Sequence, residues 1–128
     1  IDVNAGSFTL HAPKFGSQTR FNFESKGTSI AAAIDTSAAA PVSKVLCCEG
    51  NISGDISRIR ANGAVVQTST ADQGTGAYGN YPLYIGRRNN ASLPFSGRIY
   101  QLIVRGAESN AGQIAATEAW CNSKTRAY

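Results

Sequence analysis

The stretch DISRIRANGAVVQTS, residues 55–69, constrains the fold of this chain more than any other feature. Its Asn62-Gly63 dipeptide suits a two-residue type I′ turn, in which both central residues need a positive φ. Such a turn predicts an antiparallel hairpin with the pairs Ala61–Ala64, Ile59–Val66 and Ser57–Thr68. In this register Ile59 and Val66 share the buried face, whereas Arg58 and Arg60 face the solvent.

Short β-prone runs separated by Gly, Pro, Asn and Asp occupy most of the remaining chain. In residues 7–13 a face of Phe8, Leu10 and Ala12 alternates with a face of Thr9 and His11. In residues 19–25 two aromatic residues, Phe21 and Phe23, alternate with Arg20, Asn22 and Glu24. This period of two predicts half-buried antiparallel strands with the apolar side chains inward. We predict further strands at residues 30–34, 42–50, 83–87 and 97–106.

Residues 109–124, SNAGQIAATEAWCNSK, are the one segment with a helical pattern. Either Ser109 or Asn110 can cap the helix, and Gln113 stands three residues after Asn110, as a capping box requires. The residues Ile114, Thr117 and Cys121 predict an apolar stripe, with Trp120 beside it as a core anchor. Many short strands and one late helix predict an all-β fold: a two-sheet antiparallel β-sandwich (jelly roll) with one C-terminal α-helix.

Composition excludes several classes of protein. With 128 residues we expect one domain, residues 1–128, and no apolar run is long enough to cross a bilayer. The net charge is +4, but the basic residues are dispersed, so we expect no nucleic-acid partner and no membrane insertion. The three cysteines, Cys47, Cys48 and Cys121, have neither zinc-ligand spacing nor the even count of a disulfide framework. On a strand, Cys47 and Cys48 point to opposite faces.

Three motifs carry a family resemblance. Leu83-Tyr84-Ile85-Gly86, then Phe95-Ser96-Gly97-Arg98-Ile99, then residues 109–114 resemble the closing segment of concanavalin A-like, laminin-G-like jelly-roll domains. The resemblance covers residues 8–128. The sequences of residues 69–88 and 115–128 are similar to domains of phage and prophage tail-associated proteins. Complete domains of this type begin with further strands, so we expect this chain to lack its first strands. Exposed sheet edges invite pairing, and we therefore expect self-association.

The loops carry the candidate binding residues. Residues 70–82 and the basic loop after Ile85 offer tyrosine rings that can stack on sugars and polar groups that can bind ring hydroxyls. The predicted ligand-binding residues are Asp72, Gln73, Tyr78, Asn80, Tyr81, Arg88 and Asn89. The alternative is that these residues only form turns and pack the loops, as Gly, Asn and Tyr often do.

Catalytic chemistry is not expected. Hydrolases of the resembled fold carry paired carboxylates on one strand. Here the eight acidic residues are isolated in sequence, and His11 has no neighbouring nucleophile. The loops lack the acidic density of a calcium site, and we expect no metal and no cofactor.

The resemblance therefore implies a non-catalytic adhesion or glycan- and receptor-binding module of a phage or prophage tail-associated protein. Its setting would be the virion exterior or a prophage-bearing bacterium, with cell-surface glycan or other virion and host proteins as partners. The alternative is a purely structural protein-interaction domain, and a glycan hydrolase ranks third.

Overall fold

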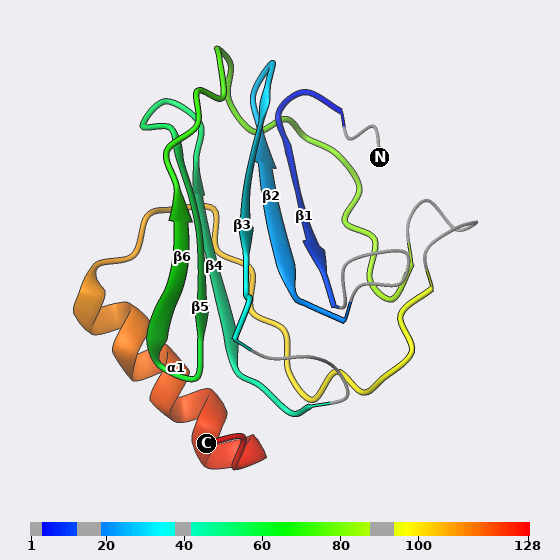
Figure 1. The fold of residues 1–128 in the computed structure, drawn as a ribbon, viewed down its shortest axis with the longest axis vertical. Coiled ribbons are helices and arrows are strands. Elements are labelled where there is room, and N and C mark those ends of the chain that lie inside the picture. Colours follow the sequence, from blue (N-terminus) through cyan, green and yellow to red (C-terminus); the bar gives the residue numbers. More distant parts are fainter. Residues whose placement is uncertain (1–3, 13–18, 38–41, 88–93) are drawn as a thin grey trace.

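The computed structural model describes residues 4–12, 19–37, 42–87 and 94–128. In this part of the chain two three-stranded antiparallel sheets are followed by one helix (Figure 1). The first sheet has the order β1-β2-β3 and the second the order β4-β5-β6. The elements are β1 (Ser7–His11), β2 (Asn22–Lys26), β3 (Ile30–Ile34), β4 (Leu46–Asn51), β5 (Ile56–Ala61), β6 (Ala64–Ser69) and α1 (Ala111–Thr125).

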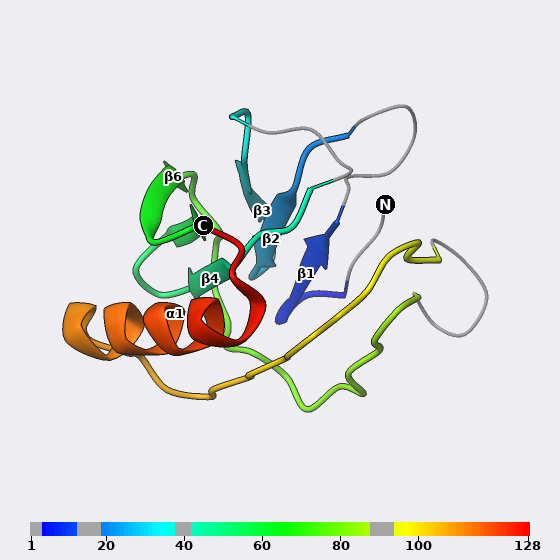
Figure 2. The same cartoon turned by 90° about the horizontal axis from the view of Figure 1, so that it is seen from below.

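The two sheets pack face to face as a β-sandwich, and the predicted fold class is thereby confirmed. Phe23 of β2, and Phe21 just before this strand, meet the fully buried Ile59 of β5 in the core. Strands β3 and β6 lie together, and the backbone N–H of Ile34 donates to the Gln67 side chain between them. Figure 2 shows the sheets diverging toward β1 and β4. We call the side of the sandwich between β1 and β4 the open side.

The Asn62-Gly63 turn forms as predicted, with φ values of 52° and 83°. Ala61 pairs with Ala64, but a β-bulge then shifts the register by one residue. The predicted pairs Ile59–Val66 and Ser57–Thr68 are therefore wrong, and the observed pairs are Ile59–Gln67 and Ser57–Ser69. Val66 is the extra residue of the bulge and still packs against the core.

Strand β1 reverses the predicted burial pattern. Phe8 and Leu10 do point into the sandwich, since Leu10 pairs with Phe23, yet each is 43% exposed. The reason is that β1 is an edge strand on the open side, where nothing in the described part of the second sheet covers it. His11 on the outer face is buried beside Asn22, whose amide nitrogen lies 3.3 Å from His11 Nδ1 and donates to Glu24 Oε1 at 2.8 Å.

Strand β2 shows a second departure from the predicted burial pattern. Residues 19–25 were predicted to have one solvated face, but Asn22 and Glu24 are buried along with Phe21 and Phe23. The two polar side chains bind each other, since the Asn22 amide donates to Glu24 Oε1, and a period-two pattern does not reveal such a pair.

The predicted strands at residues 83–87 and 97–106 are wrong, because the described parts of both segments have irregular backbone. Their large apolar side chains are about half exposed. In Figure 2 the light-green segment and the nearly straight yellow segment pass beside the open side without joining a sheet. A β-prone sequence becomes a strand only when a neighbouring backbone completes its hydrogen bonds.

Helix α1 begins as predicted, with Asn110 as N-cap and Gln113 completing the capping box. Its buried residues are Ile114 and Glu118, and it packs on β4. Arg60, predicted to face the solvent, binds the Glu118 carboxylate at 2.8 and 2.9 Å. Of the predicted stripe, Ile114 is buried and Cys121 is half-buried, but Thr117 is exposed. Trp120 is 47% exposed, so its predicted core role is wrong. No helix in the described residues is long and apolar enough to span a membrane.

A buried ion pair between Asp35 and Lys44 predicts acid sensitivity. Burial alone would raise the pKa of the Asp35 carboxyl, but hydrogen bonds from Lys44 and Ser37 outweigh burial and lower it from 3.8. Because this pKa is lower in the folded state than in the unfolded state, the ionised carboxylate stabilises the fold at pH values above the unfolded-state pKa. That stabilisation is lost as the pH falls through the folded-state pKa. We expect the free energy of unfolding to decline below about pH 4.

Urea unfolding at several pH values tests this expectation. Asp35→Asn should flatten the decline, while Asp72→Asn, which changes an exposed loop carboxylate, should keep it. Equal acid slopes for wild type and Asp35→Asn would show that other groups govern the acid sensitivity.

Candidate functional site

Gln73 fixes the loop that leads from β6 to the open side. The residue is fully buried, and its side-chain oxygen accepts from Ser25 Oγ at 2.5 Å. Its side-chain nitrogen donates to the Asn51 carbonyl at 3.0 Å. Its backbone N–H donates to Asp55 Oδ1 at 2.8 Å, and its carbonyl accepts from the Ser29 N–H at 3.0 Å. One glutamine therefore ties the loop to both sheets.

Tyr78 is the second residue that positions the loop. Because Ser25 Oγ donates its single hydrogen to Gln73, the Tyr78 hydroxyl donates to Ser25, at 2.6 Å. Burial raises the pKa of this phenol above its usual value. The ring meets Phe8 edge-on, with centroids 5.9 Å apart and planes at 87°. A Cβ at Gly50 would lie 2.0 Å from the Tyr78 hydroxyl oxygen, so a side chain there would displace the tyrosine.

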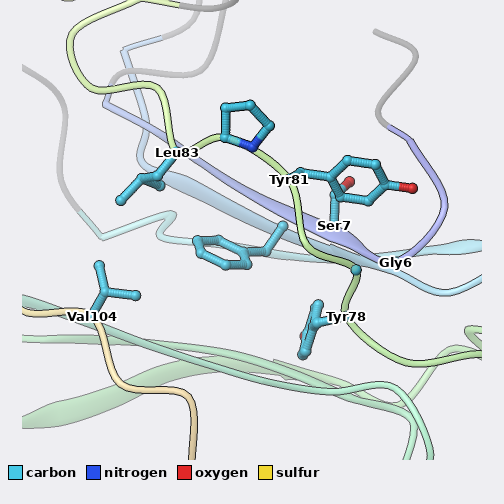
Figure 3. A pocket seen from close by; sticks show the side chains of 9 residues that line it. Gly6, Ser7, Tyr78, Tyr81, Leu83 and Val104 are labelled. Carbon is cyan, nitrogen blue, oxygen red and sulfur yellow. The ribbon is translucent and has the colours of Figure 1, made fainter.

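A cavity of about 230 Å³ lies next to Tyr78 on the open side. Figure 3 shows Tyr78, Tyr81, Leu83 and Val104 around it. Tyr81 is 51% exposed, so its ring is accessible from the solvent. Among the described residues the lining is mainly aromatic and aliphatic: Gly6, Ser7, Phe8, Tyr78, Gly79, Tyr81, Pro82, Leu83 and Val104. This lining suits an apolar group better than a polar one.

The predicted binding residues do not all meet at this cavity. Tyr78 and Tyr81 line it together. Asp72 is exposed elsewhere in the loop and accepts from the Gly74 N–H, Gln73 is buried as described, and Asn80 is exposed. Arg88 and Asn89 lie outside the described residues.

The sequence prediction missed Phe8, Leu83 and Val104 as site residues. All three occupy apolar positions of runs that were assigned to core strands. No signal in the sequence distinguishes them from core residues, because an apolar β-prone run looks the same whether or not a partner strand pairs with it.

Most described carboxylates have a structural partner in the chain. Cations bind Asp35, Glu49 and Glu118. Backbone N–H groups donate to Asp55 and Asp72, and the Asn22 amide donates to Glu24. In this part of the molecule no group of three His, Cys, Asp or Glu side chains could hold a metal ion.

Comparison with known proteins gives one match. A family model described as the concanavalin A-like lectin/glucanases superfamily, of the laminin-G type, matches residues 1–115. Searches of curated proteins and of solved structures found no match. The matched residues include all six strands, the cavity and the start of α1.

Proposed function

Because the chain belongs to the concanavalin A-like lectin/glucanases superfamily, we propose that it is a non-catalytic binding module whose open side holds an apolar segment of another protein chain. The superfamily commonly binds carbohydrates or mediates protein interactions. The apolar lining of the cavity favours the second of these two activities for this chain.

The observation that carries the proposal is a concentration of exposed apolar side chains around the open side. The large apolar side chains exposed on β1 and on the two irregular segments that pass beside the open side are Phe8, Leu10, Tyr81, Leu83, Ile85, Ile99, Leu102, Ile103 and Val104. Single exposed apolar residues are ordinary on a protein surface, but a contiguous group of them marks an interaction site. Phe8, Tyr81, Leu83 and Val104 are contiguous, because they line one cavity.

The backbone next to the cavity supports the same proposal. Strands β1 and β4 are outer strands of their sheets. Residues 79–87 pass beside the open side without a regular ladder, and the Gly79 N–H donates to the Gly6 carbonyl next to β1. Unpaired backbone groups of an edge strand can bind an added strand, while pockets select its alternate side chains.

The occupant we propose is a second copy of this chain. Residues 99–104, IYQLIV, provide a β-prone apolar segment that the described sheets leave unpaired. Only 16% of the residues are charged, and the net charge of +4 is dispersed, so repulsion between copies is weak. Self-association would also multiply weak contacts with a third partner.

The absence of catalysis is part of the proposal. The carboxylates that have cationic or N–H partners would need to lose them before acting as acid or base. A glycoside hydrolase needs two carboxyl groups facing one cleft. The described lining of the cavity holds no carboxylate at all.

The biological setting we propose is a phage or prophage tail-associated protein, on the virion exterior or encoded in a bacterium. It is supported by the sequences of residues 69–88 and 115–128, which are similar to domains of such proteins. The partners would then be other virion or host proteins.

Glycan binding is the second candidate, and the exposed ring of Tyr81 at the cavity favours it. An aromatic face can stack on the apolar face of a sugar. In a glycan-array measurement, Tyr81→Ala should lose at least roughly tenfold in affinity, about 1.4 kcal/mol, for any glycan bound here. Tyr84→Ala is the control, because Tyr84 is equally exposed outside the cavity lining. Equal losses from both variants, or binding unaffected by Tyr81→Ala, would remove this candidate.

Hydrogen exchange at two protein concentrations tests the proposed self-association. At about 1 μM the amides of residues 81–87 and 99–104 should exchange quickly, and at about 200 μM they should be protected by the second copy. Amides of β5, which is paired on both sides, are the internal control. Exchange that is independent of concentration in both segments would contradict the proposal.

A further inference from the structure

Cys47 lies on the outer face of the second sheet, beneath α1. It pairs in register with Arg60 of the neighbouring strand, so the two side chains point to the same face. Arg60 holds the Glu118 carboxylate of α1 through two hydrogen bonds of 2.8 and 2.9 Å. The helix is therefore fixed over the position of Cys47.

Cys121 belongs to the helix face that meets β4. It follows Glu118 by three residues, which places both on one side of a helix. Cys121 is half-buried, whereas the neighbouring Trp120 is 47% exposed. The packing of α1 on β4 thus brings a cysteine of the helix toward a cysteine of the strand.

We propose that Cys47 and Cys121 are a disulfide-forming pair that links α1 covalently to β4 in an oxidising environment. Both are free thiols in the reduced chain. Cys48, the third cysteine, points to the opposite face of β4 and packs against the core. The pair is therefore selected by the fold and not by its spacing in sequence.

The reaction balances with a small disulfide such as oxidised glutathione as oxidant. The Cys121 thiolate attacks one sulfur of the oxidant, the S–S bond breaks, and one reduced glutathione leaves. The Cys47 thiol then loses its proton and attacks the Cys121 sulfur of the mixed disulfide, which releases the second glutathione. Two electrons pass from the cysteines to the oxidant, and two glutathione thiols are formed.

The surroundings of Cys47 assign it the second step. Burial, followed by the charges of Glu118 and Glu49, raises its pKa to about 11, so it is a poor attacking group toward an external oxidant. Inside the mixed disulfide the reacting sulfur is already adjacent, which compensates for low thiolate content. Burial raises the pKa of Cys48 further, to about 12, and this thiol stays reduced.

The test is incubation of the folded protein with oxidised glutathione, followed by thiol titration and peptide mapping under non-reducing conditions. We expect reactive thiols in the denatured product to fall from three to one and a peptide pair joined through Cys47 and Cys121. The melting temperature should rise by roughly 10 °C and return on reduction, because the link closes a long loop in the unfolded chain.

Matched variants distinguish this pair from other oxidation products. Cys47→Ser and Cys121→Ser should each abolish the intramolecular link, and Cys48→Ser should retain it. The proposal would be overturned if the oxidised wild type kept three free thiols, formed a link through Cys48, or formed a cross-link between two chains. All three outcomes are measured on the wild type, so they do not require any variant to fold.

Discussion

Val104→Asp and Leu83→Asp are each expected to abolish self-association of the chain over the concentration range in which the wild type associates. Both side chains line the cavity on the open side and are 56% and 53% exposed. Association would bury the new carboxylate against an apolar surface without a cationic partner, which is strongly unfavourable. We expect sedimentation velocity to show a dissociation constant more than tenfold higher, which corresponds to a loss of more than about 1.4 kcal/mol of binding free energy.

Val65→Asp is the matched control for both variants. Val65 is 51% exposed, close to Val104, but it lies on β6 at the opposite side of the sandwich. This variant should associate like the wild type and keep its free energy of unfolding. If Val65→Asp weakens association as much as Val104→Asp, association is a general effect of surface hydrophobicity and does not use the open side.

Gln73→Ala is expected to lower the free energy of unfolding by roughly 2–4 kcal/mol, because several buried groups lose their partner at once. The Ser25 hydroxyl loses its acceptor, the Asn51 carbonyl loses its donor, and a cavity replaces a fully buried side chain. Tyr78 is bound to the same Ser25, so the cavity should also lose its shape. Urea unfolding gives the stability, and a shift in the association constant reports the cavity.

Asp72→Ala is the control for the role of Gln73. It removes an exposed neighbouring side chain and one hydrogen bond to the Gly74 N–H, and we expect a cost of at most about 1 kcal/mol. If the two variants are equally stable, the loop is not held by the Gln73 side chain.

Features that depend on a few adjacent residues were predictable from the sequence. The Asn62-Gly63 turn needs only two residues that tolerate positive φ, and the helix start needs only Asn110 and Gln113. The alternation of Phe21 and Phe23 gave the inner face of β2 correctly.

Features that depend on what packs alongside were not predictable in this way. The bulge at Val66 changes the register without any local signal. The exposure of Phe8 follows from the edge position of β1, and His11 is buried beside Asn22 of the neighbouring strand. The outward position of Trp120 follows from the Arg60–Glu118 pair. Each of these is decided by residues distant in sequence.

The residues of the candidate site also differ in whether the sequence predicts them. Tyr78 and Tyr81 were predictable because one loop carries both. The sequence could not indicate that Phe8 and Val104, from opposite ends of the chain, complete the cavity, or that Gln73 supports the loop from within.

The molar mass of the wild type by light scattering during size-exclusion chromatography tests the central claim most directly. For a chain of 13.4 kDa, we expect a mass of at least twice this value at high concentration that falls toward the monomer on dilution. A mass of 13.4 kDa that persists up to about 200 μM, from a protein that unfolds cooperatively, would contradict self-association through the open side.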